Sequence, residues 1–325
     1  MAAVIDELKH RAAGSEQIQP DEALALYRAG TAEPFRLMAA ASELRELFKG
    51  RLVSLCAIVN AKSGLCPENC RFCAQSAHYE TSAPVYDLLP AAEIVARGRD
   101  AYHDGAHMFG IVTSGTQIGD DAEWDEIYQA VKGLNNIGIR PCASLGLLEA
   151  GRATKLKSAG LFRYHHNLET ARSFFHNICS THDYEEDVAT VRTAREAGLT
   201  VCSGGIIGLG EGIEHRIEMA VTLRELGVDS VPINILNPIP GTPLEDTPQL
   251  EPMEILLTVS VLRFLLPDKD IKLCGGKEHN LRQLLPLGIV AGANSLMTGN
   301  YLTTTGRNTE LDLELIRDLR MTAAF

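Results

Sequence analysis

The chain has no long apolar run and no excess of basic residues, and these two absences exclude several classes of protein. No segment of its 325 residues is apolar over the length that crosses a bilayer, and the opening MAAVIDELKHRAAGSEQ lacks the apolar core of a secretory signal. Acidic residues outnumber basic ones by 42 to 30, and no basic stripe is interleaved with aromatic residues. We therefore expect a cytoplasmic protein whose partners include neither a membrane nor a nucleic acid.

Cysteine is unevenly distributed along the chain, and its distribution is informative. The chain has eight cysteines, of which three are clustered and the others are scattered. Small secreted proteins use dense cysteine patterns as disulfide frameworks, whereas a local cluster in a larger chain indicates metal chemistry in the cytosol. The composition, 45% hydrophobic and 22% charged, is that of an ordinary globular protein with one large domain or two small ones.

The clustered cysteines are Cys66, Cys70 and Cys73, in the C-x3-C-x2-C run CPENCRFC. Three thiolates can hold a four-iron cluster by three corners and leave one iron open to bind a substrate or cofactor. A zinc site is an alternative, because His78 could complete a tetrahedral set, although no second pair of close cysteines follows. Unliganded thiols are a third interpretation. The spacing favours iron–sulfur chemistry.

The pattern along the chain predicts a parallel barrel. Residues 1–48 have helical periodicity, and short apolar runs then alternate with helical segments at 91–102, 122–132, 184–197, 214–226 and 252–264. The runs that predict strands are Leu52–Val59, His107–Thr113, Ile139–Leu145, Phe162–Asn167, Thr200–Ile207, Ser230–Leu236, Ile271–Cys274 and Ala293–Met297.

Eight such units match a (β/α)8 TIM-type barrel over residues 49–300, with an N-terminal helical extension at 1–48 and a C-terminal cap at 301–325. A doubly wound open sheet is the rival fold, because counting strands does not prove that the sheet closes. In either fold the cysteine triplet directly follows the first strand. Barrel enzymes build their active sites at that end of the strands, so the position favours a catalytic role over a structural zinc site.

Four of the remaining cysteines fall on alternate predicted strands. Cys56, Cys142, Cys202 and Cys274 lie on the first, third, fifth and seventh strands. Because a barrel interior is filled in layers of side chains from alternate strands, the four could share one layer and hold a second metal cluster. The alternative is that each is a small buried apolar residue of a strand. Cys179 fits no layer and is predicted to be a loop thiol.

Polar residues occur where the fourth and sixth strands end. His165, Asn167 and Glu169 stand at the end of the fourth strand, where they could bind ribose hydroxyls or simply form a solvated rim. Asn234 lies inside an otherwise apolar sixth strand, where its amide suits an uncharged polar group of a substrate. Local hydrogen bonding to the backbone explains that amide equally well.

The fifth strand runs into the glycine-rich stretch SGGIIGLGE at 203–211. Glycines let the backbone approach a ligand closely and expose amide groups to it, but a tight connection between strand and helix requires them just as often. Arg216 follows this turn and could hold a carboxylate through both arms of its guanidinium group.

These motifs carry a family resemblance. The cysteine triplet, with Phe72 before its last cysteine, resembles the signature of radical S-adenosylmethionine enzymes. The phrases CPENCRFCAQS, VCSGGIIGLGE, VPINILNPIPGTPL and AGANSLMTGNYL together resemble the biotin synthase family over about residues 45–305. The resemblance implies a barrel enzyme, usually a homodimer, that converts dethiobiotin to biotin by inserting sulfur between two unactivated carbons. A reductant such as flavodoxin or ferredoxin would supply electrons.

The resemblance also implies roles for individual residues. A 4Fe–4S cluster held by the triplet would bind S-adenosylmethionine at its open iron and cleave it reductively, and the resulting radical would abstract hydrogen inside a barrel that excludes water. Asn167 and Glu169 match the ribose-binding positions, with Glu169 where the family usually has Asp. Phe72 and Arg216 match further cofactor positions, the latter for the carboxylate, and Asn234 matches a substrate-binding amide.

Two positions depart from the family pattern. The usual family holds a sulfur-donating 2Fe–2S cluster with cysteines on strands 2, 3 and 5 and an arginine on strand 7, but here Met108 and Lys272 replace the first and the last of these. Cys274 lies two residues from Lys272 and hence on the same strand face. We therefore hypothesise an auxiliary cluster of the four-iron type that donates the sulfur, with the ligands Cys56, Cys142, Cys202 and Cys274.

A third departure concerns the substrate. His165 stands where the usual family has Asn, which makes it a candidate for altered recognition of the ureido ring. A second hypothesis is thus a related radical enzyme that acts on another small molecule, in a carbon-skeleton rearrangement or in hydrogenase-cofactor maturation. A zinc-dependent barrel or a non-catalytic cluster carrier is a third.

Overall fold

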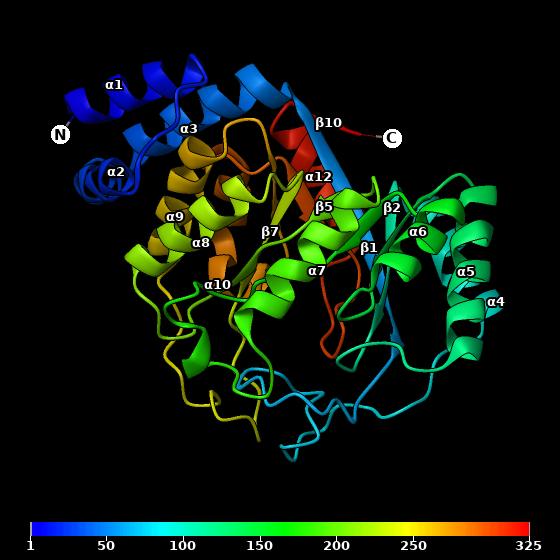
Figure 1. The fold of residues 1–325 in the computed structure, drawn as a ribbon. Helices are drawn as coiled ribbons and strands as arrows, with labels where there is room; N and C mark the ends of the chain where they lie inside the picture. The colour runs from blue at the N-terminus through cyan, green and yellow to red at the C-terminus, as the bar shows by residue number, and fades with distance from the viewer. Residues whose placement is uncertain (1, 325) are drawn as a thin grey trace.

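The computed structural model describes residues 2–324, and its core is a closed parallel barrel (Figure 1). The strands follow the order β1-β2-β3-β4-β5-β7-β8-β9, and β9 returns to pair with β1, which closes the ring. β5 and β6 are two pieces of the fifth barrel strand, because both pair with β7. The strands are β1 (Leu52–Lys62), β2 (Met108–Thr113), β3 (Arg140–Ser144), β4 (Arg163–His165), β5 (Thr200–Cys202), β6 (Gly205–Ile207), β7 (Ser230–Ile235), β8 (Asp270–Leu273) and β9 (Ser295–Met297).

The barrel confirms the predicted fold class, and each of the eight predicted apolar runs overlaps an observed strand. Pairing of β1 with β9 excludes the open, doubly wound sheet. One predicted placement needs a small correction, since Cys274 directly follows the last residue of β8 rather than lying within it. The amide of Cys274 still donates to the carbonyl of Ile233 on β7, so the residue keeps the height of the strand end.

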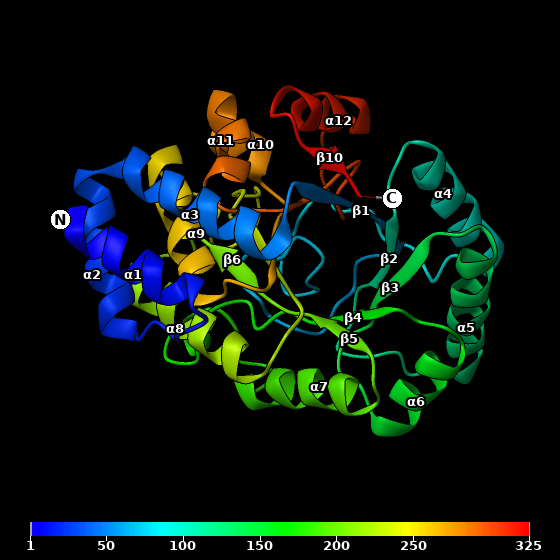
Figure 2. The ribbon, with the colours of Figure 1, turned by 90° about the horizontal axis from the view of Figure 1, so that it is seen from above.

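Helices surround the barrel, as the view from above shows (Figure 2). The five predicted helical segments correspond to α4, α5, α7, α8 and α9, whereas the short and polar α6 was not predicted. The helices are α1 (Ala2–Ala13), α2 (Pro20–Ala32), α3 (Pro34–Lys49), α4 (Ala91–His103), α5 (Asp121–Asn136), α6 (Ala150–Ser158), α7 (Tyr184–Glu196), α8 (Ile213–Glu225), α9 (Pro252–Leu265), α10 (Lys277–Leu281), α11 (Leu285–Val290) and α12 (Thr309–Asp318).

The N-terminal helices α1, α2 and α3 pack outside the barrel against α8 and α9 (Figures 1 and 2). As a result α9 lies between this extension and the barrel, and its residues from Ile255 to Leu265 are all buried. A helix covered on every side is apolar all round. Its one buried cation, Arg263, is accommodated because its guanidinium group donates to the Gly292 carbonyl and to the side-chain oxygen of Asn294.

The end of the chain returns to the start of the barrel. After α12, the short strand β10 (Thr322–Ala323) pairs in parallel with Leu52 and Val53, the first residues of β1. Within residues 2–324, no helix is both long enough and apolar enough to span a membrane.

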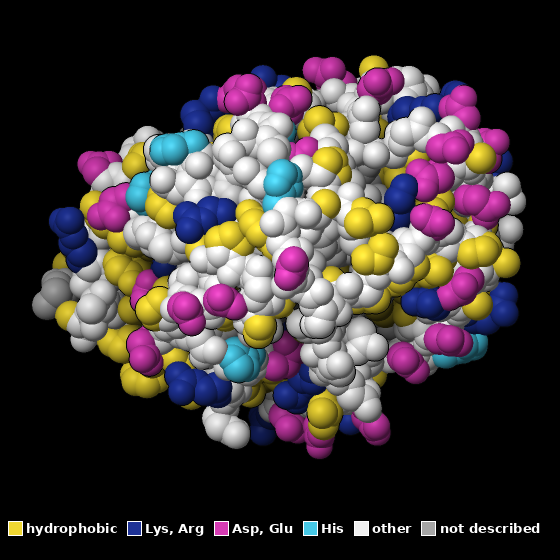
Figure 3. Space-filling view, turned by 90° about the horizontal axis from the view of Figure 1, so that it is seen from below, with side chains coloured by type: hydrophobic (Ala, Val, Ile, Leu, Met, Phe, Trp, Pro, Cys, Tyr) yellow, Lys and Arg dark blue, Asp and Glu magenta, His cyan; other side chains and the backbone are white. Residues whose placement is uncertain are grey.

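The long segment between β1 and α4, which carries the cysteine triplet, covers one end of the barrel (cyan at the bottom of Figure 1). Acidic and basic side chains are interspersed on the face seen from this side (Figure 3). The carboxyl ends of the parallel strands point the same way, so the loop lies over the end of the barrel where the polar strand-end residues are found.

Candidate active site

A cavity of about 320 Å³ lies inside the barrel, and every barrel strand contributes to its lining. This volume suits a small molecule. The lining includes Phe72 from the loop after β1, as well as Leu302, Thr303 and Thr304 from the segment after β9. The cavity therefore extends from the barrel interior to the loops that cover its open end.

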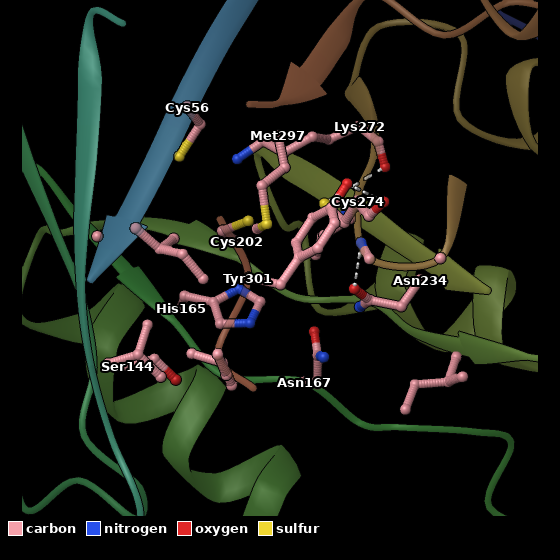
Figure 4. Close-up of a pocket in the computed structure, with 18 of the residues that line it drawn as sticks. Cys56, Ser144, His165, Asn167, Cys202, Asn234, Lys272, Cys274, Met297 and Tyr301 are labelled. Carbon is pink, nitrogen blue, oxygen red and sulfur yellow. Dashed lines mark hydrogen bonds between the residues drawn. The ribbon is translucent and has the colours of Figure 1, made fainter. Parts of the chain in front are cut away.

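The four cysteines predicted to share a layer all line this cavity, namely Cys56, Cys142, Cys202 and Cys274. Each is buried, with at most 6% of its surface exposed. Cys56 and Cys142 belong to one buried cluster, and Figure 4 shows Cys56, Cys202 and Cys274 grouped around Lys272. The structure thus brings together residues that are more than 200 positions apart in the chain.

Two buried cations accompany these thiols. Burial favours the neutral amine of Lys272, but the nearby thiolates of Cys56, Cys202 and Cys274 outweigh this effect and raise its pKa. Arg163, a register partner of Cys142 on the neighbouring strand, is also buried in the cavity wall. Among the described residues its Nη1 has no hydrogen-bond partner, so one of its donors is available for a bound group.

The electrostatics of the cavity favour the ionised form of two of the four thiols, Cys56 and Cys202. The Cys56 and Cys142 side chains interact with each other, and this interaction lowers the pKa of Cys56 and raises that of Cys142. Burial opposes ionisation of Cys202, but the ammonium group of Lys272 and the His165 imidazole outweigh it and lower its pKa to about 6. Burial raises the pKa of Cys274 to about 12. Thiolates beside buried cations and a free guanidinium donor are a donor set that fits an iron–sulfur cluster.

Met108 lies next to Cys56 on the neighbouring strand. Met108 and Cys56 are register partners on β2 and β1, and both pack against Cys142. Among the described residues of β2, Gly110 and Val112 line the cavity and Met108 does not, so the match of Met108 to the family's cysteine position stays a prediction.

The loop that carries the triplet is held by its own hydrogen bonds. Cys66, Cys70 and Cys73 are partly buried, and the amide of Cys66 donates to the carbonyl of Gln75. The side-chain oxygen of Gln75 in turn accepts from the Asn60 side chain at 3.1 Å, which fixes the loop to the C-terminal end of β1. Burial raises the pKa of Cys66 and raises that of Cys73 to about 11. Three thiols on one short, fixed loop fit a four-iron cluster with an open corner.

His78, the candidate for a zinc site with the triplet, is exposed and its Nε2 lies 2.9 Å from the carbonyl of Pro67. The ring is therefore engaged with the backbone in this structure.

Asn167, Glu169 and His165 line the same cavity, and Figure 4 shows His165 and Asn167 on one side of the group formed by Cys56, Cys202 and Lys272. The side-chain oxygen of Asn167 is buried and unpartnered within residues 2–324, while its amide nitrogen donates to Glu169 at 3.3 Å. Burial raises the pKa of Glu169 to about 7. An unpartnered acceptor next to a carboxyl group suits a ligand rich in hydroxyl groups, such as a ribose.

Asn234 also lines the cavity, but most of its amide is committed to the backbone. Its oxygen accepts from the amide of Gly275 at 3.0 Å, and its nitrogen makes a long contact of 3.4 Å with the carbonyl of Gly205. One N–H group of Asn234 remains for a ligand. The predicted substrate contact and the local alternative are thus both compatible with its position.

Arg216 is buried in ion pairs with two carboxylates. Among the described residues it lies outside the cavity lining, and its guanidinium group donates to Glu211 at 2.7 Å and to Glu254 at 2.8 Å. Glu211 in turn accepts from the amides of Gly208 and Leu209. In this structure Arg216 therefore supports the glycine-rich turn through Glu211, and its contact with a cofactor carboxylate stays a prediction.

The glycines before this turn serve close packing. A Cβ atom on Gly204 would lie 2.0 Å from the carbonyl oxygen of Pro232, and one on Gly205 would lie 2.4 Å from that of Glu169. Real Cβ atoms do not approach so closely, so both positions require glycine. This supports the interpretation of the stretch as a tight connection.

Two further features of the site were not predicted. Arg163 is one, and the only feature of the sequence that points to it is a charged residue inside the predicted strand at 162–167. Tyr301 is the other, and its hydroxyl is 2.8 Å from Lys277 Nζ and donates to Glu278. The neighbouring carbonyl of Leu302 accepts from the Asn60 side chain, so the segment after β9 is tied across the cavity mouth.

Comparison with known sequences identifies the family. Residues 62–223 match the Radical SAM superfamily, and residues 232–322 match the Biotin and Thiamin Synthesis associated domain. A protein named biotin synthase from Geotalea uraniireducens is 52% identical over 325 residues, which cover 100% of this chain and 99% of that protein. Another biotin synthase, from Geobacter sulfurreducens, is 52% identical over 318 residues, or 98% and 97% of the two chains.

Solved structures with low sequence identity share the fold. Methylornithine synthase aligns with a TM-score of 0.82 at 21% identity, covering 98% of this chain and 97% of that one. The FeFe-hydrogenase maturase HydG from Carboxydothermus hydrogenoformans aligns with a TM-score of 0.82 at 18% identity, covering 99% and 79%. At these identities the likeness concerns the barrel alone.

The cofactors that accompany these matches are a 4Fe–4S cluster with S-adenosylmethionine and an auxiliary iron–sulfur cluster. Both thiol groups described above fit such clusters by their chemistry. Full-length identity near 50% and the paired domains show that the chain belongs to the biotin synthase family of radical S-adenosylmethionine enzymes, which insert sulfur.

Proposed function

We propose that this protein converts dethiobiotin to biotin, with the barrel cavity as the reaction chamber. The observation that carries this proposal is the convergence of four buried cysteines, Lys272 and the strand-end polar residues on one cavity of about 320 Å³. Identity of 52% to biotin synthases over the full length supports the substrate assignment. When bound, the 4Fe–4S cluster with S-adenosylmethionine supplies the radical chemistry and the auxiliary cluster supplies the sulfur.

The loop cysteines Cys66, Cys70 and Cys73 would hold the 4Fe–4S cluster. Phe72, which lies between them, faces the cavity and packs near Leu209 and Leu236. This apolar contact seats the loop on the barrel mouth and keeps water from the space between loop and cavity.

The auxiliary cluster would be of the four-iron type, with Cys56, Cys142, Cys202 and Cys274 as its ligands. Burying several thiolates is unfavourable unless opposite charges accompany them. Lys272 and Arg163 supply these charges, and the unpartnered Nη1 of Arg163 can donate to a sulfide of the cluster. The pairing of Met108 with Cys56 supports a ligand set displaced by one strand from the usual one.

Polar residues between the two cysteine groups would hold the organic ligands. Asn167 and Glu169 are suited to the ribose of S-adenosylmethionine, since the first offers a free acceptor and the second a carboxyl group. His165 and Asn234 would contact dethiobiotin, the former from beside Cys202 and the latter with its remaining N–H group. We still expect the protein to form a homodimer, to accept electrons from a flavodoxin- or ferredoxin-type donor and to be cytoplasmic, and these three stay predictions. The eight free cysteines are compatible with a cytoplasmic setting.

The test of the reaction is anaerobic incubation of reconstituted protein with S-adenosylmethionine, a reductant and dethiobiotin, followed by mass detection of biotin and 5′-deoxyadenosine. We expect both products. Deoxyadenosine without biotin would contradict the substrate assignment and favour another small molecule. A colourless, zinc-containing protein that forms neither product would contradict radical chemistry altogether.

The test of the auxiliary cluster is iron and acid-labile sulfide analysis of the same preparation. We expect the content of two four-iron clusters, and the content of one in the Cys56→Ala and Cys274→Ala variants. A 2Fe–2S spectrum that is insensitive to both substitutions would contradict the four-cysteine ligand set.

A further inference from the structure

Beside the cysteine triplet lies a second group of metal-binding side chains that the proposed function does not use. Its members are Glu68, from the triplet loop, and Cys179 and His182, from the segment after β4. Their ligand atoms all lie within 4.8 Å of one another. His182 Nδ1 is 2.8 Å from Glu68 Oε2 and 3.3 Å from Cys179 Sγ, so a single ring nitrogen faces both of the other donors.

The other nitrogen of His182 is also occupied. Its Nε2 lies 3.3 Å from Asp187 Oδ2, and the second oxygen of Asp187 lies 2.8 Å from His166 Nε2. Asp187 is buried, with 4% of its surface exposed. Metal-binding histidines characteristically have a carboxylate on the nitrogen that does not face the metal, because it fixes the tautomer and the orientation of the ring. His182 has this arrangement, with Nδ1 on the side of the candidate site.

A fourth donor comes from the triplet itself. Cys70 is brought beside Cys179, because the amide of the next residue, Arg71, donates to the carbonyl of Ile178 at 3.0 Å and Cys179 Sγ donates to the Asn69 side-chain oxygen at 3.5 Å. Two thiols, one imidazole and one carboxylate form a set of four donors of the kind that binds zinc tetrahedrally. Oxygen ligands alone would suit magnesium or calcium, whereas this mixture of sulfur, nitrogen and oxygen selects a borderline transition metal.

Other contacts already join the two segments, so these donors are not needed to connect them. The Asn69 side chain donates to Ser180 at 2.8 Å, and its oxygen accepts from the amide of Ser180 at 2.9 Å. Thr181 accepts from the amide of Asn69 at 3.1 Å. These bonds hold the segment that carries Cys179 against the triplet loop and position the donor set.

We propose that Glu68, Cys179 and His182 bind one divalent ion of the zinc class, and that Cys70 completes the site while the 4Fe–4S cluster is absent. Binding displaces the protons that the two sulfur atoms and Nδ1 of His182 hold, and it changes no oxidation state. Because Cys70 is also a ligand of the proposed cluster, the ion and the cluster compete for it. Zinc at this site therefore blocks assembly of the radical-generating cluster.

A matched pair of full-length variants tests the site without requiring any cluster. The Cys66→Ala/Cys73→Ala chain cannot hold the 4Fe–4S cluster but keeps all four donors, and a third substitution, Cys179→Ala, removes one of them. We expect the double variant to bind one more equivalent of Co²⁺ than the triple variant, with the visible bands of tetrahedral cobalt bound to thiolate. Any cobalt that binds to the barrel cysteines binds equally to both chains, so it does not contribute to the difference in cobalt content between them.

Equal cobalt content and equal spectra in the two chains would overturn the proposal. Asp187→Asn in the double variant provides a second measurement, because loss of the orienting carboxylate is expected to weaken Co²⁺ binding by about 10- to 100-fold. A circular dichroism spectrum and an unfolding midpoint for each variant establish that the chains being compared are folded.

Competition with the cluster is tested in the otherwise unsubstituted chain and rests on the proposed role of Cys70. One equivalent of Zn²⁺, added before anaerobic reconstitution, is expected to prevent iron from entering the triplet, and Cys179→Ser is expected to relieve this block. Equal inhibition in both chains would mean that zinc occupies the triplet alone, which would overturn the competition. The cobalt difference would still stand in that case, so the two failures are distinguishable.

Discussion

The two groups of cysteines in this protein differ in what surrounds them. The triplet lies in a loop, where burial raises the pKa of Cys66 and of Cys73, the latter to about 11. The barrel cysteines are more deeply buried, yet the pKa of Cys202 falls to about 6 because Lys272 and His165 lie beside it. In the loop, metal binding itself must drive off the thiol protons. In the barrel, the protein's own cations already favour thiolates at Cys56 and Cys202, whereas the pKa of Cys142 and that of Cys274 stay raised.

The largest effect should follow from removing a triplet cysteine. Cys73→Ala takes away a ligand of the cluster that cleaves S-adenosylmethionine, so we expect complete loss of both 5′-deoxyadenosine and biotin. The measurement is mass detection of the two products after anaerobic incubation. If deoxyadenosine formed at the unsubstituted rate, the loop would not be the radical-generating region.

Substitution of a barrel cysteine should show that the two groups of cysteines have separate roles. In Cys142→Ala we expect biotin formation to disappear while deoxyadenosine formation persists, because the sulfur donor is lost and the radical source is intact. Iron analysis should show the loss of one cluster only. The comparison would fail if both products declined in parallel, since the two groups would then act as one.

Lys272 tests whether the barrel cations matter in their own right. We expect Lys272→Met to lower retention of auxiliary iron by about 10- to 100-fold, as for other groups that support metal ligands. Lys272→Arg keeps the charge and is expected to retain the iron. Iron content after exposure to a chelator measures the effect. Equal retention in all three chains would show that the thiolates need no buried cation.

The smallest effect concerns Glu169, which lies between the two regions. Burial raises its pKa to about 7, so the carboxyl group is largely neutral at pH 6 and ionised at pH 8. A ribose hydroxyl donates more strongly to the ionised form. We therefore expect S-adenosylmethionine to bind about five- to tenfold more tightly as pH rises through 7.

Isothermal titration of the reconstituted enzyme at several pH values measures this dependence. Glu169→Gln, which cannot ionise, is the control and should show a flatter profile. Identical pH profiles for the two chains would assign the dependence to another group.

The fold was predictable from the sequence because a local pattern of residues predicts each strand. Apolar runs such as Leu52–Val59 and Ser230–Leu236 alternate with amphipathic helices, and the barrel then follows from their number. Closure required the structure, since it depends on the pairing of β9 with β1. The short helix α6 was missed because its sequence has few apolar residues to define a face.

The site was predictable where residues carry their own signal. Four cysteines on alternate strands predicted a shared cavity, and the structure places all four there. Partnerships formed across the fold left no such signal. The spacing of Arg216 gave no indication of Glu254, 38 positions away, and Cys179 looked like an isolated loop thiol because Cys70 and His182 meet it only after folding.

The pairing of β10 with the first residues of β1 has a practical consequence. Thr322 and Ala323 hydrogen-bond the beginning of the strand that carries Cys56 and leads into the triplet loop. A purification tag fused after the last residue would begin beside this strand pairing, whereas one placed before α1 would lie on the outer helical layer. Protein intended for cluster reconstitution should therefore carry its tag at the N-terminus.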